Sequence, residues 1–110
     1  MKIIECVPNF SEGNNLAIIN SIKNITNSFK DITLLDVDPG KATNRTVITF
    51  AGPPNAVIEC AFEMIKIAAE LIDMESHKGE HPRMGATDVC PLIPISGVTI
   101  EECIGYSIKL

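Results

Sequence analysis

The sequence predicts an α+β domain built from four strands and two long helices, with a third helix after them. Short apolar stretches typical of strands are separated by longer stretches whose apolar residues recur at helical spacing. Pro, Gly, Asn and Asp residues, which favour turns, stand between these stretches. The two periods follow one another in the order β-α-β-β-α-β, and a last helical stretch ends the chain.

The first strand and the first helix are predicted within residues 2–29. Lys2 to Val7 is a short apolar stretch that Pro8 ends, and the turn-rich segment 8–13 follows it. Between Asn14 and Phe29, four apolar residues recur at spacings of four, three and four, which builds one face of an α-helix. These residues are Ile18, Ile22, Ile25 and Phe29.

The second and third strands are expected to form a hairpin. Asp31 to Val37 has the composition of a strand, and Arg45 to Ala51 alternates β-branched and aromatic residues. Residues 38–43, Asp-Pro-Gly-Lys-Ala-Thr, carry strong turn signals. The sequence therefore predicts that the chain turns back within this segment.

A long amphipathic helix is predicted after the hairpin. Pro53 and Pro54 open it, because proline is tolerated in a first helical turn, where its missing N–H would have no partner. A continuous apolar stripe then lies opposite charged residues, which predicts a helix to about Met74, before Gly79 and Pro82 break the pattern. The stripe consists of Val57, Ile58, Ala61, Phe62, Ile65, Ala68, Ala69 and Ile72.

The fourth strand is predicted from Thr87 to Ile95. Pro91 and Pro94 should confine its pairing to a sheet edge or to short stretches, since proline has no N–H to donate. A last helix is predicted to begin near residues 98–99. Thr99 and Glu102 have the three-residue spacing of a capping box, which marks a helix N-terminus.

This order of elements is that of the ferredoxin-like folds, in which two helices pack on one face of a single sheet. Residues 1–110 are therefore interpreted as one domain, a ferredoxin-like α+β sandwich with an additional C-terminal helix. The other sheet face should also be rich in Val, Ile and Leu, so another chain or segment must cover it to bury it away from solvent. We therefore expect the isolated chain to be a homo-oligomer, most simply a dimer.

Composition and charge exclude several classes of protein. Hydrophobic residues make up 45% of the chain and charged residues 21%, as in ordinary globular proteins. The net charge of −5 argues against a general nucleic-acid or anionic-membrane binder. No signal sequence or membrane-spanning stretch is visible, so a cytoplasmic protein is expected. The four cysteines form no C-x-x-C pair, so free thiols buried in the core are expected.

Both histidines, His77 and His81, lie in a short segment that is rich in charged residues and glycine. Histidine exchanges protons near neutral pH, so an acid–base site is one interpretation. The other is a solvated loop whose polar residues cap the long helix and pair with one another, and the residues alone leave both open. The segment also matches H-x-x-E-H, but Gly79 and Pro82 would weaken or end the helix that this zinc motif needs. No metal site is expected.

Further polar residues stand near the ends of the predicted strands. Asn and Asp at such places either shape turns or line a site, and both interpretations stay open for each residue. Cationic side chains there could also create a local positive field for a carboxylate substrate on an otherwise acidic protein. The polar residues are Asn9, Asp36, Asp38 and Asn44, and the cationic ones are Lys41, Arg45, Lys78 and Arg83.

Several motifs, spread in order over essentially the whole chain, resemble the amino-terminal subdomain of glutamate formimidoyltransferases, including the formimidoyltransferase-cyclodeaminases. They are residues 5–13, 34–38, 44–46, 71–74 and 77–94. The resemblance implies two ferredoxin-like subdomains, with tetrahydrofolate and N-formimidoyl-L-glutamate bound between them. It also implies transfer of the formimidoyl group to N5 of tetrahydrofolate, the co-substrate, in the last stage of histidine breakdown.

The resemblance assigns His81 as the catalytic acid–base and places Asp38 near it. Arg45, Lys78 and Arg83 are expected, by charge alone, to bind the carboxylates of glutamate or of the folate tail, and Asn9 and Asn44 complete the expected substrate-binding set. Family members continue well past residue 110. The chain is thus interpreted as a standalone relative, as one part of a split enzyme whose partner chain supplies the second subdomain, or as a fragment, and the residues leave all three open. The alternative is a non-catalytic folate-binding, regulatory or assembly module.

Overall fold

The computed structural model describes residues 1–72 and 86–109. Within these residues an antiparallel sheet carries three α-helices, which confirms the α+β class and is compatible with the ferredoxin-like fold. The elements in chain order are β1 (Ile3–Cys6), β2 (Asn9–Phe10), α1 (Leu16–Lys23), the 3₁₀-helix η1 (Asn24–Ser28), β3 (Thr33–Gly40), β4 (Arg45–Gly52), α2 (Pro54–Leu71), β5 (Thr87–Val89), β6 (Leu92–Ser96) and α3 (Ile100–Lys109).

Strand β4 lies inside the sheet. It pairs with β3 on one side and with β1 and β2 on the other, while β6 pairs with β1 and β5 pairs with β2. The first predicted strand corresponds to β1 alone, and β2 lies within residues 8–13, where a turn was predicted instead of a strand. The fourth predicted strand is divided into β5 and β6. The interruption between β1 and β2 faces the one between β5 and β6, because the Val7 amide donates to the Pro91 carbonyl at 3.1 Å. Proline in each interruption removes one ladder donor, which explains why pairing stops there.

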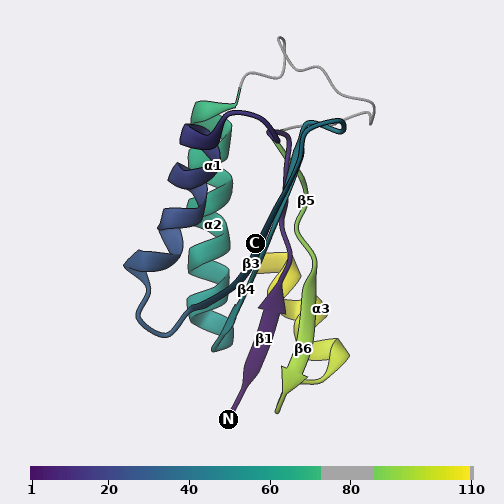
Figure 1. Cartoon of the computed structure of the whole chain (residues 1–110). Helices are drawn as coiled ribbons and strands as arrows, with labels where there is room; N and C mark the ends of the chain where they lie inside the picture. Colours follow the sequence, from purple (N-terminus) through teal and green to yellow (C-terminus); the bar gives the residue numbers. More distant parts are fainter. Residues whose placement is uncertain (73–85, 110) are drawn as a thin grey trace.

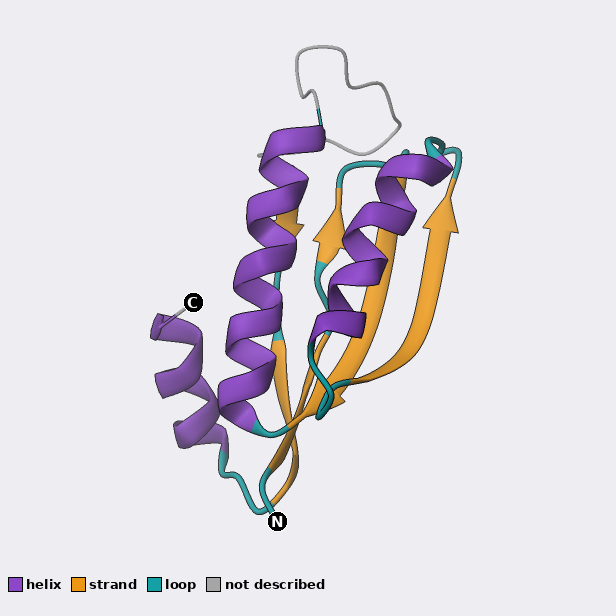
Figure 2. Cartoon of the chain, turned by 90° about the vertical axis from the view of Figure 1, so that its left-hand side faces the viewer, coloured by secondary structure: helices purple, strands orange, loops and turns teal. Residues whose placement is uncertain are grey.

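Helices α1 and α2 cover the same face of the sheet (Figure 1, Figure 2). Side chains of β4 alternate accordingly: Thr46, Ile48 and Phe50 are buried beneath the helices, and the residues between them are half-buried on the opposite face. Helix α3 packs against β6 and α2, and its Cys103 joins the core. The prediction that both long helices lie on one face is confirmed.

The hairpin prediction is confirmed, but the predicted turn at residues 38–43 begins too early. Strand β3 continues through Asp38, Pro39 and Gly40, which pair with β4. In the described residues β3 pairs only with β4, so it is an edge strand, where the missing N–H of proline costs no hydrogen bond. The reversal follows at residues 41–44, where Asn44 takes the left-handed φ of 51° that asparagine tolerates.

Both predicted long helices end somewhat earlier than expected. The first one ends at Lys23, and residues 24–28 continue as the 3₁₀-helix η1. Helix α2 ends at Leu71, because Ile72 is already extended, and Met74 lies outside the described residues. Such differences of a few residues are usual at helix ends, which fray or tighten.

The predicted capping box at the start of α3 is confirmed. The Thr99 amide donates to Glu102 Oε1 at 3.1 Å, and the Glu102 amide donates to Thr99 Oγ1 at 3.1 Å. The second carboxylate oxygen of Glu102 accepts a bond from Lys2 Nζ at 3.3 Å. The box thus satisfies two amides of the first helical turn and links α3 to the start of the chain.

Candidate functional site

Three of the residues predicted for the site, Asp38, Asn9 and Arg45, lie on one face of the sheet, the face opposite α1 and α2. Asp38 of β3 and Asn9 of β2 are both paired with Val47 of β4, from its two sides. Residues directly opposite in an antiparallel ladder point to the same face, so the side chains of Asp38, Val47 and Asn9 form a row across the sheet. Adjacent strands are about 4.8 Å apart, so roughly 10 Å separates the backbones of Asp38 and Asn9.

The two polar ends of this row differ in exposure. Asp38 is exposed, whereas Asn9 is only 7% exposed and its Nδ2 donates to the Val7 carbonyl at 3.0 Å. Between them, half-buried Val47 forms an apolar floor. An apolar surface with a few fixed polar groups is the usual composition of a small-molecule site. Sequence reasoning did not select Val47, although the alternation in residues 45–51 already places it on one face with Arg45.

Arg45, the first residue of β4, lies close to this row on the same face of the sheet. It is half-buried, pairs with Gly40, and lies two residues before Val47, about 7 Å along the strand. Residues two apart in a strand share a face. Its guanidinium group therefore belongs to the surface that carries the row, where it can attract a carboxylate.

Asn44 takes part in the local structure of the hairpin turn. Its Oδ1 accepts bonds from the Gly13 amide at 2.8 Å and from Asn14 Nδ2 at 2.9 Å. Asn14 Nδ2 also donates to the Lys41 carbonyl at 3.4 Å. These bonds fasten the segment after β2 to the turn between β3 and β4, so Asn44 holds the two parts of the row in register.

The same segment carries the start of α1. Glu12 Oε2 accepts bonds from the amides of Asn14 and Asn15 at 3.1 and 3.0 Å. Asn15 Oδ1 in turn caps the helix by accepting from the Ala17 and Ile18 amides at 3.0 and 3.2 Å. Thr46 Oγ1 donates to the Glu12 carbonyl from β4. Residues 9–15 are thus fixed by hydrogen bonds to the start of α1 and to β4, which gives Asn9 a defined position.

The remaining predicted site residues, Lys78, His81 and Arg83, lie outside the described residues. The described chain resumes at Ala86, whose carbonyl accepts a bond from the Ser11 amide at 2.8 Å. Strand β5 follows, and its Val89 pairs with Asn9. The row of Asp38, Val47 and Asn9 therefore continues directly into the strand that follows the histidine-containing segment.

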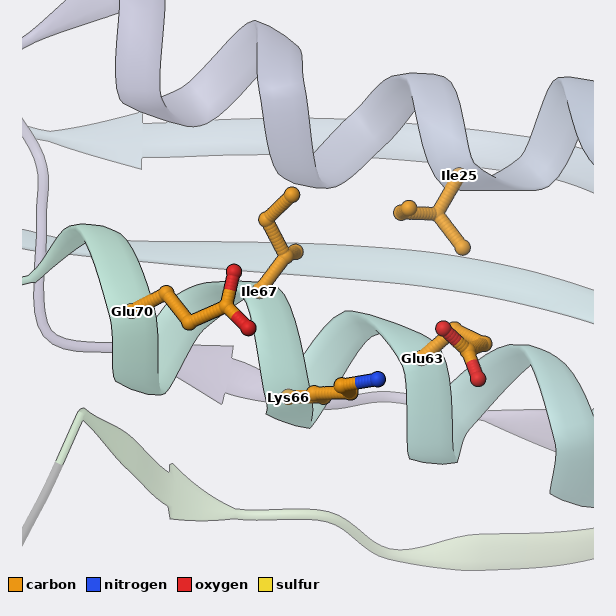
Figure 3. Close-up of a pocket in the computed structure, with 5 residues that line it drawn as sticks. All are labelled: Ile25, Glu63, Lys66, Ile67 and Glu70. Carbon is orange, nitrogen blue, oxygen red and sulfur yellow. The ribbon is translucent and has the colours of Figure 1, made fainter.

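A shallow hollow lies elsewhere, in the helical layer. It encloses about 150 Å³ between η1 and α2. Figure 3 shows Ile67 and Ile25 facing each other across it and three charged side chains of α2 at its rim. Its lining residues are Ile25, Glu63, Lys66, Ile67 and Glu70. Because α2 lies on the opposite side of the sheet from the row, the hollow is not part of the candidate site.

In residues 1–72 and 86–109, no group of three or more His, Cys, Asp or Glu side chains lies close enough to hold a metal ion. None of the helices described there is long and apolar enough to cross a membrane.

Comparison with known proteins relates the whole chain to one family. The family model described as formiminotransferase domain, N-terminal subdomain, matches residues 3–110. The chain is 55% identical to the formimidoyltransferase-cyclodeaminase of Dictyostelium discoideum over 106 residues, which are 96% of this chain and 20% of that protein. It is 55% identical to the mouse (Mus musculus) protein of the same name over 103 residues, 94% of this chain and 19% of that protein.

A bacterial relative named glutamate formimidoyltransferase is also similar. The chain is 49% identical to the glutamate formimidoyltransferase of Streptococcus pyogenes serotype M1 over 106 residues, which are 96% of this chain and 36% of that protein. The chain thus spans between about a fifth and about a third of the length of these relatives. By the extent of the family match and by these identities, the chain belongs to the family of formiminotransferase N-terminal subdomains.

Proposed function

We propose that this chain supplies the acid–base half of a glutamate formimidoyltransferase site, with His81 as the proton carrier and Asp38 beside it. The reaction is transfer of the formimidoyl group from N-formimidoyl-L-glutamate to N5 of tetrahydrofolate. The observation that supports this most is the row of Asp38, Val47 and Asn9 on the face opposite α1 and α2. The names of the relatives, which are formimidoyltransferases, supply the reaction class.

Chain length allows His81 to act at this row. His81 precedes Ala86 by five residues, and five residues span at most about 18 Å when fully extended. The Ala86 carbonyl accepts a hydrogen bond from the amide of Ser11, which lies two residues after Asn9. A catalytic histidine in this segment can therefore meet a substrate that rests on Val47, while Asp38 holds its imidazolium form by opposite charge.

The residue types suit the proton balance of the transfer. N5 of tetrahydrofolate attacks the amidine carbon and forms a C–N bond, and His81 accepts the proton that N5 loses. The bond between that carbon and the glutamate nitrogen then breaks, and His81 returns the proton to the departing nitrogen. One base of near-neutral pKa thus serves both steps. Arg45, Lys78 and Arg83 bind substrate carboxylates, and Asn9 fixes the ligand by hydrogen bonding.

The histidine assignment is tested by turnover in an active enzyme that contains residues 1–110 together with the second subdomain. His81→Ala should lower kcat by about 10²-fold or more, as expected for loss of a general acid–base. His77→Ala is the matched control, and it should cost much less. Equal losses at the two histidines, or no loss at His81, would remove His81 from the mechanism.

The row is tested with two aspartates of the same strand. Asp36 pairs with Thr49 and Asp38 with Val47, so both lie on the face opposite the helices, about 7 Å apart, and both are exposed. Asp38→Asn should reduce kcat at least about tenfold, because it removes the charge beside the histidine. Asp36→Asn should have little effect. A larger loss of kcat in Asp36→Asn than in Asp38→Asn would show that the site lies elsewhere along β3.

Titration with folinate, a stable tetrahydrofolate analogue, separates the enzyme from the alternative of a non-catalytic folate-binding module. Under the proposal, folinate binds to the active assembly, and Val47→Asp weakens binding because it places a charge on the apolar floor. Folinate binding without formimidoyl transfer in any assembly would favour the binding module. Absence of folinate binding in an assembly that still transfers the group would place the folate surface outside this chain.

A further inference from the structure

Two cysteines that are far apart in the sequence meet inside the fold. Cys6 ends β1, and Cys90 lies in the interruption between β5 and β6. Their sulfur atoms are 3.5 Å apart although 84 positions separate them in the chain. The backbone holds them there, because Cys6 pairs with Leu92 and the Val7 amide donates to the Pro91 carbonyl at 3.1 Å.

The two thiols differ in access to solvent. Cys6 is 0% exposed and belongs to the core, whereas Cys90 is half-buried at the edge of that core. Cys90 is therefore the more accessible of the two residues, while Cys6 has no exposed surface and lies beside the Cys90 sulfur. This is the arrangement of an attacking and a resolving thiol.

The hydrogen bond between the two sulfur atoms favours the same division of roles. It lowers the pKa of the Cys90 thiol, because the Cys90 thiolate can accept a hydrogen bond from Cys6. The same bond, together with burial, raises the pKa of Cys6. Burial raises the pKa of Cys60 to about 12, so this third thiol is a poor nucleophile at neutral pH.

We propose that Cys90 and Cys6 form a redox modification site that low-molecular-weight disulfides of the glutathione type oxidise to an intramolecular disulfide. The Cys90 thiolate attacks one sulfur of the small disulfide, which releases one thiol and leaves a mixed disulfide on Cys90. Cys6 then loses its proton and attacks the Cys90 sulfur, and the second small thiol leaves. In sum, two protein thiols are oxidised to one disulfide, and one small disulfide is reduced to two thiols.

Formation of this bond requires a small movement at a defined place. A disulfide has an S–S distance of about 2.05 Å, so the sulfur atoms must approach by about 1.5 Å. The bond would join Cys6, the last residue of β1, to Cys90, which lies between β5 and β6. In a reducing compartment the pair stays as thiols and is oxidised only when the small-disulfide pool rises.

The test begins with the folded, unaltered chain and oxidised glutathione, followed by alkylation, proteolysis and peptide mass mapping. The expected product is one peptide pair linked through Cys6 and Cys90, reversed by dithiothreitol. In a separate reaction with limiting iodoacetamide, Cys90 should be alkylated before Cys6, Cys60 and Cys103. A linked pair that forms only in denaturant, or links that involve Cys60 or Cys103 equally, would overturn the proposal.

Single variants divide the two steps. In Cys6→Ala the resolving thiol is absent, so a glutathione adduct should accumulate on Cys90. In Cys90→Ala neither adduct nor linked pair should form, because Cys6 is buried. Cys60→Ala is the matched control and should still yield the linked pair. Circular dichroism checks that each variant is folded, and if a variant is not, the alkylation order and the linked peptide of the unaltered chain decide the question.

Discussion

Gly13→Ala tests how closely the segment after Asn9 must approach the turn between β3 and β4. A Cβ atom placed on Gly13 would lie 2.5 Å from the Arg45 amide nitrogen and well inside the contact radius of the Gly40 carbonyl oxygen. Both are backbone atoms, so neither can rotate away as a side chain could. The segment and the turn would have to separate, and the row they align would be disturbed.

The cost follows from what that separation breaks. The bond from the Gly13 amide to Asn44 Oδ1, 2.8 Å long, and the bond from Thr46 Oγ1 to the Glu12 carbonyl would both be lost. Each contributes about 0.5–1.5 kcal/mol. Relief of the overlap adds about 1–3 kcal/mol. The free energy of unfolding should therefore fall by about 2–6 kcal/mol, and Tm by at least about 8 °C.

Urea unfolding followed by circular dichroism measures this loss, and the chain offers a control. Gly105 lies within α3, and a Cβ placed on it meets no atom within 4 Å. Gly105→Ala should raise the free energy of unfolding by about 0.5–1 kcal/mol, because glycine is a poor helix former. Replacement of glycine by alanine should therefore lower the free energy of unfolding at Gly13 and raise it at Gly105. If the free energy of unfolding of Gly13→Ala lies within about 0.5 kcal/mol of that of the unaltered chain, the close approach of the segment to the turn is not required for stability.

Thr99→Ala should lower the free energy of unfolding by about 1 kcal/mol, as loss of a helix cap does, while Ser107→Ala on the exposed side of α3 should not; equal urea curves for the two variants would deny the cap a role. Bonds from the Thr99 amide and Lys2 lower the pKa of Glu102 below its ordinary value of 4.5. Its contribution to stability is therefore present above about pH 4.5 and lost as pH falls further, so the difference between the unaltered chain and Glu102→Gln should shrink in acid and vanish there; a difference independent of pH would contradict this. Sedimentation equilibrium at micromolar concentration should show association, because several large apolar side chains of β5, β6 and α3 are exposed; a monomer near 11.9 kDa at all concentrations would contradict it.

Local patterns were sufficient for the order of the longer elements, although they missed the short strand β2. The apolar stripe of α2 and the three-residue spacing of Thr99 and Glu102 both reflect the geometry of a single helix, so they can be read without knowledge of the fold. The same is true of the β3–β4 hairpin, whose strands are neighbours in the sequence. The predicted turn at residues 38–43 began too early, since Pro39 on an edge strand has no donor to lose and β3 continues through it to Gly40, before the reversal at residues 41–44.

The candidate site required contacts between distant parts of the chain. Asp38, Val47 and Asn9 form a row only because β3 and β2 pair with β4 in one particular register, and a shift of one residue would turn each side chain to the other face. The Cys6 and Cys90 thiols likewise meet because the facing strand interruptions bring residues 84 positions apart together. The role of His81 stays a prediction from the sequence, since that residue lies outside the described part of the chain. Spacing along a chain encodes neighbours within one element, whereas register between strands depends on hydrogen bonds and core packing that only the folded chain defines.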